Sequence, residues 1–154
     1  MIVPVVVPAS MKVVSITVRQ GVSDGTQRNF AAGLACETSY GSGDLVMISQ
    51  AATGNYTAGA VSNETLNIGG ALGYVIIEPG VYWVVVQNLH ATRSHVTRVL
   101  GGGDWTPNVA ATSTTIGNLA GVDGTTFDAT QFGTKVTGIP MVRLNGDVFG
   151  AGAF

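Results

Sequence analysis

The sequence predicts an all-β fold, an antiparallel β-sandwich of the jelly-roll type with an extended N-terminal arm. Charged residues are only 10% of the 154 residues, against roughly 25% in an ordinary soluble domain. Long surface helices need charged residues on their solvent-exposed faces, so this composition argues against them. Short alternating segments separated by Gly, Thr and Asn turns are typical of sandwiches. A chain of this length can fold around a single hydrophobic core. We therefore expect an arm over residues 1–10 and a single domain over residues 11–154.

The arm is apolar and uncharged, with the sequence Met-Ile-Val-Pro-Val-Val-Val-Pro-Ala-Ser. Pro4 and Pro8 keep it extended and deprive it of two backbone donors. We expect it to lie along a neighbouring subunit or another protein as an added edge strand whose valines fill pockets. The alternative is that it folds back as the first strand of its own sheet. Its two prolines, and the absence of basic residues before the apolar run, fit neither a secretory signal nor a membrane helix.

Alternating patterns predict the strands of the domain. In residues 12–19, Val14, Ile16 and Val18 share one side. Residues 30–36 and 45–48 are expected to form a hairpin around a Gly-Ser loop. Further strands are expected over 64–68, 73–77, 81–88, 93–100 and 136–144.

Residues 81–86 contain no polar side chain that would face water, so this strand should be central and covered on both sides. We expect residues 93–100 to pair with it. Residues 51–59 are expected to form a loop, and residues 104–135 a long segment without periodicity that is functional or packed against something else. Pro140 places the last strand at an edge or a bulge.

No constellation in the sequence points to catalysis, a cofactor or a metal. Cys36 is the only cysteine, and its place in an alternating apolar segment predicts a core residue. His90 and His95 are five residues apart and would project to opposite faces of a strand, which does not suit a metal site. The acidic residues are spread singly beside Gly or Thr, as turn residues are. We therefore expect that the protein is not an enzyme.

The charge pattern also restricts the partners. Seven basic residues are scattered along a chain of net charge −2, so we expect no nucleic-acid partner. We expect no membrane partner either. Because few charges guard the sheet edges, self-association is expected. Trp105 is a candidate interface anchor, with a sugar-stacking platform and a lid over the core as alternatives. The residues expected at an interface are Ile2, Val3, Val5, Val6, Val7, Trp105 and Phe154.

One segment resembles a known family. Residues 77–87, Ile-Glu-Pro-Gly-Val-Tyr-Trp-Val-Val-Val-Gln, are similar to the L-x-P-G-x-Y-W segment and hydrophobic run of jelly-roll domains in tailed-bacteriophage virion proteins, namely capsid decoration proteins and tail-fibre heads. Residues 14–18, 33–45 and 138–142 resemble the opening strand, hairpin and closing strand of that family in the same order. The hairpin departs from the family at Cys36 and Glu37.

The resemblance implies a virion protein that is not an enzyme and forms a homotrimer. Such a protein is made in the host cytoplasm and assembles into the virion. It would either decorate and cement the capsid surface, binding the major capsid protein, or act as a tail-fibre head that binds a host surface glycan or protein. The short arm, in place of a fibre shaft, favours capsid decoration. An unrelated carbohydrate-binding module or hydrolase is the third hypothesis.

Overall fold

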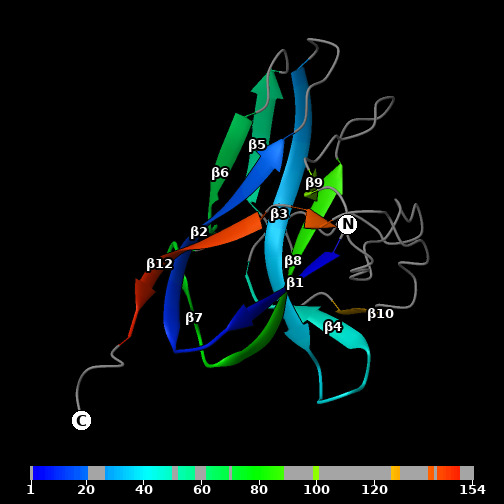
Figure 1. Cartoon of the computed structure of the whole chain (residues 1–154), viewed down its shortest axis with the longest axis vertical. Helices are drawn as coiled ribbons and strands as arrows, with labels where there is room; N and C mark the ends of the chain where they lie inside the picture. The colour runs from blue at the N-terminus through cyan, green and yellow to red at the C-terminus, as the bar shows by residue number, and fades with distance from the viewer. Residues whose placement is uncertain are drawn as a thin grey trace.

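The structure, a computed structural model, describes residues 2–20, 27–49, 52–57, 62–69, 71–88, 99–100, 126–128, 139–140 and 142–149. Within these ranges every regular element is a β-strand. Two antiparallel sheets pack face to face (Figure 1), which confirms the predicted β-sandwich.

The larger sheet, called sheet A here, has the order β1 (Ile2–Val7), β8 (Gly80–Asn88), β3 (Gln27–Glu37), β4 (Asp44–Met47) and β10 (Thr126–Asp128), and β5 (Ala52–Thr57) also pairs with β3. The second sheet, sheet B, has the order β12 (Val142–Val148), β2 (Met11–Gln20) and β6 (Ser62–Asn67), and β7 (Val75–Ile77) also pairs with β2. A separate pair joins β9 (Val99–Leu100) to β11 (Ile139–Pro140).

Two bent ribbons connect the sheets. The chain segment β1–β2 runs beside β7–β8, because β1 pairs with β8 in sheet A and β2 pairs with β7 in sheet B. Both segments change sheet at the same corner, where the Ser10 hydroxyl donates to the Glu78 carboxylate and the Tyr82 hydroxyl donates to the Glu78 carbonyl oxygen. A second set of pairings has the same arrangement, because β2 pairs with β6 in sheet B and β3 pairs with β5 in sheet A. Ribbons shared by both sheets agree with the jelly-roll type of sandwich that the sequence predicts.

The core lies between the sheets. Phe30 and Leu34 of β3 and Val84 of β8 point inward from sheet A and meet Ile16 and Val18 of β2. All five side chains are fully buried. Phe30 is the largest fully buried side chain among the described residues, so its truncation to alanine would cost about 3–5 kcal/mol.

A bulge in β2 changes the predicted alternation. Val13 pairs with Gly146 and Ser15 with Asn145, so Val14 is an extra residue with no register partner on β12. Val13 is therefore buried and Val14 is exposed. The expectation that Val14 shares the buried side of Ile16 is wrong for this reason.

The strand β8 is central, as its apolar sequence predicts. Val84 and Val86 face the core between the sheets, whereas Val85 is buried on the opposite face of sheet A in a second cluster with Ile2, Ala35, Leu45 and Met47. Both sides are therefore covered along this half of β8. At its other end Val81 is half exposed.

Three expectations are corrected. Residues 93–100 do not pair with β8 over their described part, because β1 and β3 occupy both of its edges and residues 99–100 pair with β11. Residues 52–57 form a strand where a loop was expected, because β3 extends beyond β4 and offers them a free edge. Residues 126–128, in the segment without periodicity, pair with β4.

Candidate interaction surface

The arm forms the first strand of its own sheet, the alternative that the sequence left open. All six residues of β1 pair with β8. Val3 and Val7 are buried between the sheets, and Ile2 is buried in the second cluster. These three side chains are therefore buried within the chain itself, because β1 pairs with the edge of β8 and packs against its apolar neighbours. Val5 is half-buried, and Val6 is exposed.

An apolar strip runs along the outer face of β1 and β8. Val6 and Val81 lie directly opposite each other and are 74% and 50% exposed. The next pair on the same face, Pro4 and Trp83, is half-buried. These four residues are called the apolar strip below.

The strip borders an edge of the sandwich. Within the described residues, β1 has no partner on the side away from β8. Proline in an edge strand is tolerated because a missing N–H costs least there, and Pro4 fits that rule. Natural sheets usually protect such an edge with charged side chains, but β1 has none.

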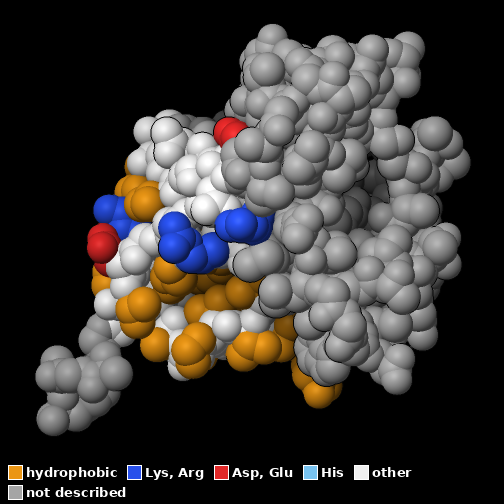
Figure 2. All heavy atoms as spheres, turned by 45° about the horizontal axis from the view of Figure 1, so that its top comes forward, with side chains coloured by type: hydrophobic (Ala, Val, Ile, Leu, Met, Phe, Trp, Pro, Cys, Tyr) orange, Lys and Arg blue, Asp and Glu red, His pale blue; other side chains and the backbone are white. Residues whose placement is uncertain are grey.

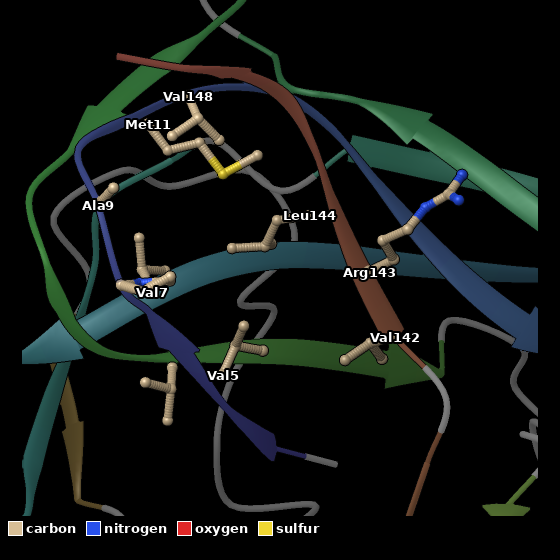
Figure 3. A pocket seen from close by; sticks show the side chains of 10 residues that line it. Val5, Val7, Ala9, Met11, Val142, Arg143, Leu144 and Val148 are labelled. Carbon is tan, nitrogen blue, oxygen red and sulfur yellow. The ribbon is translucent and has the colours of Figure 1, made fainter. Parts of the chain in front are cut away.

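A cavity of about 290 Å³ opens between β1, the edge of sheet A, and β12, the edge of sheet B. Val5 and Val7 of β1, Met11 of β2 and Leu144 and Val148 of β12 line it. Figure 3 shows these side chains around the opening, while the side chain of Arg143 turns away from them. The cavity is therefore an apolar seam between two sheet edges.

Chemically reactive groups are few in the described part of the chain. Cys36 lies half-buried on β3, and burial raises the pKa of its thiol. Because the thiolate is the nucleophile, a raised pKa makes this cysteine less reactive at neutral pH. The described residues hold no group of three His, Cys, Asp or Glu side chains able to bind a metal. They also contain no helix with the length and apolarity needed to cross a membrane.

Several predicted residues lie outside the described ranges, namely His90, His95, Trp105 and Phe154. Of the predicted interface residues, the structure leaves Val6 on the surface and Val5 at the seam. The sequence pattern did not identify Val81 as an interface residue. Its exposure depends on its place opposite Val6 at the end of β8, which the pattern does not show.

No family model, curated protein or solved structure matches the chain.

Proposed function

We propose that this chain is a structural protein of a tailed-bacteriophage virion, without enzymatic activity, which decorates the capsid exterior as a homotrimer. The positions of the similar segments support the proposal. Residues 77–87 run from the end of β7 through the corner into β8, residues 33–45 span the turn between β3 and β4, and residues 14–18 lie in β2. They therefore belong to the central strands of both sheets and to the bent ribbon that joins the sheets.

The observation that carries the proposal is the apolar strip beside an edge without charge. Full burial of a valine side chain stabilises an assembly by roughly 1.5–3 kcal/mol. In the isolated chain Val6 and Val81 are at least half exposed, so much of this stabilisation is available only if another chain buries them. A protein that works by contact with copies of itself and with coat subunits would cover this strip.

The oligomeric state of the purified protein tests the first part. Light scattering after size exclusion should give three times the chain mass of 15.7 kDa. Val6→Glu should lower that mass, because a carboxylate buried in an apolar contact is strongly unfavourable. Ile76→Glu is the matched control, since Ile76 is an exposed apolar residue on sheet B. A wild-type monomer at micromolar concentration contradicts the trimer.

The composition of purified virions tests the second part. Quantitative mass spectrometry should find the chain in hundreds of copies per particle, in a fixed ratio to the major capsid protein. A few copies per particle would instead favour the alternative, a tail-fibre head that binds a host surface glycan or protein. Absence from virions would reject both functions.

A further inference from the structure

Part of the outer face of sheet B, over β12, β2 and β6, is polar and lies on the opposite side of the sandwich from the apolar strip. The register of β12, β2 and β6 places side chains from three neighbouring strands on it. We call this surface the polar face. Its residues are Arg143 and Asn145 of β12, Ser15, Thr17 and Arg19 of β2, and Asn63, Thr65 and Asn67 of β6.

A hydrogen-bond network fixes Arg143 on this face. Arg143 Nε donates to Asn145 Oδ1 at 2.6 Å. The same amide donates through Nδ2 to Thr17 Oγ1 at 2.9 Å and to Ser15 Oγ at 3.1 Å. Ser15 and Thr17 are only 6% and 8% exposed, although they point away from the core. Buried hydroxyls thus orient the amide, and the amide orients the guanidinium.

Arg19 lies close to Arg143 and is also held by an amide. Its Nη1 donates to Asn63 Oδ1 at 3.3 Å. Arg143 is opposite Thr17, two residues from Arg19, and such diagonal neighbours have Cα atoms about 7–8 Å apart, within reach of long side chains. Figure 2 shows Lys and Arg side chains side by side, between an area of other side chains and backbone and an area of hydrophobic side chains.

Among the described residues the two guanidiniums have only neutral partners, and no carboxylate forms an ion pair with Arg19 or Arg143. Arg143 uses Nε for Asn145, and no hydrogen bond joins its terminal N–H groups to another described residue. Two adjacent guanidiniums that form no ion pair within the described part of the chain attract an anion, and the planar fork of arginine suits a carboxylate in particular.

We propose that the polar face binds an acidic saccharide, a sugar ring that carries a carboxylate. The carboxylate lies between Arg19 and Arg143, and the ring hydroxyls contact Asn63, Thr65 and Asn67. These three side chains are exposed on the neighbouring strand, and amides and hydroxyls both donate and accept, as sugar hydroxyls do. The site does not depend on the proposed function, because its residues lie on the other sheet from the apolar strip.

Three probes at equal ionic strength separate the two halves of the site. The full chain is titrated with sodium glucuronate, with sodium acetate, which has only the carboxylate, and with glucose, which has only the hydroxyls. The ¹H–¹⁵N spectrum should show millimolar binding of glucuronate at residues 15–19, 63–67 and 143–145, at least tenfold tighter than acetate. Glucose should cause no shift. Equal affinities for glucuronate and acetate, or binding of glucose as tight as glucuronate, would overturn the assignment.

Substitutions test the named residues. Arg19→Gln and Arg143→Gln should each weaken glucuronate binding about tenfold, and Asn67→Ala should weaken glucuronate binding without changing acetate binding. Lys12→Gln is the matched control, because Lys12 is a cation of the same strand as Arg19 that lies over the Tyr74 ring, 4.5 Å from its centroid, opposite Asp147. Unchanged affinity in both arginine variants, or an equal loss in Lys12→Gln, would overturn the proposal. Melting temperatures establish that each variant is folded.

Discussion

Gly146 is a position where a single methyl group should damage the sandwich. It lies on β12 opposite Val13, at the bulge, with a φ of 156°. A Cβ at this position would collide with the Lys12 carbonyl oxygen and lie 2.8 Å from the Lys12 carbonyl carbon. Both atoms belong to the backbone of β2, so no side chain can move to relieve the contact. Gly146→Ala therefore forces β12 away from β2.

The magnitude follows from two costs. A non-glycine residue in a sparsely populated backbone conformation costs of order 1–3 kcal/mol. Separation of the strands at the bulge loses one or two hydrogen bonds, each with a net contribution of about 0.5–1.5 kcal/mol. Gly146→Ala should therefore lower the free energy of unfolding by about 1.5–6 kcal/mol. For a chain of this size each kcal/mol lowers Tm by about 2–4 °C, so we expect a fall of roughly 3–24 °C.

Urea unfolding followed by circular dichroism measures this effect, and two further glycines are controls. Gly41→Ala has a positive φ of 74° but open space around the new Cβ, so it reports backbone strain alone. Gly80→Ala has no positive φ, and its Cβ would meet Tyr82 at an ordinary 3.6 Å. The order of destabilisation should be Gly146, then Gly41, then Gly80. A Gly146→Ala variant as stable as Gly80→Ala would refute the reasoning.

Two other substitutions give distinct predictions. Ser49→Ala should cost about 1–3 kcal/mol in urea unfolding, because the buried Leu34 N–H donates to Ser49 Oγ at 2.9 Å and would lose its acceptor; an equal effect of Ser42→Ala in the exposed turn would contradict this. Burial raises the pKa of the Cys36 thiol above its ordinary value of 9.0, so its contribution to stability is complete below pH 9 and is lost as the pH rises toward the folded-state pKa. Unfolding curves between pH 8 and pH 11 should show a shallower loss of stability in Cys36→Ala than in the wild type, and identical slopes would contradict the raised pKa.

Three strands could be predicted from sequence because apolar side chains recur at every second position of β2 and β3 and form a continuous run in β8. β2, β3 and β8 are found where the pattern places them. The pattern fails where backbone pairing decides the structure: β5, with the sequence Ala-Thr-Gly-Asn-Tyr-Thr, has no apolar period and forms along the free part of β3. The pattern also fails at Val14. The bulge adds one residue to β2, and this reverses which residues face the core on one side of it, although the strand remains rich in apolar residues.

The candidate surfaces were less predictable because they depend on register between distant strands. The sequence identifies the arm as an unusual apolar segment, but only the pairing of β1 with β8 shows that Val6 stays outside while Val3 is buried. The polar face has no sequence motif. Arg19 and Arg143 are far apart in the chain and come to diagonal positions on neighbouring strands because β2 pairs with β12.

The pairing of β1 with β8 also has a consequence during protein synthesis. The strand β1 leaves the ribosome before its partner residues 80–85, which are made more than seventy residues later. At 5–20 residues per second, this delay is roughly 4–15 s. Throughout it, five uncharged β-branched side chains of the nascent chain have no strand to join. When several ribosomes translate one message, the β1 of a younger chain can reach the finished β8 of an older one, so the closing of this sheet is a competition between a chain's own strand and its neighbour's.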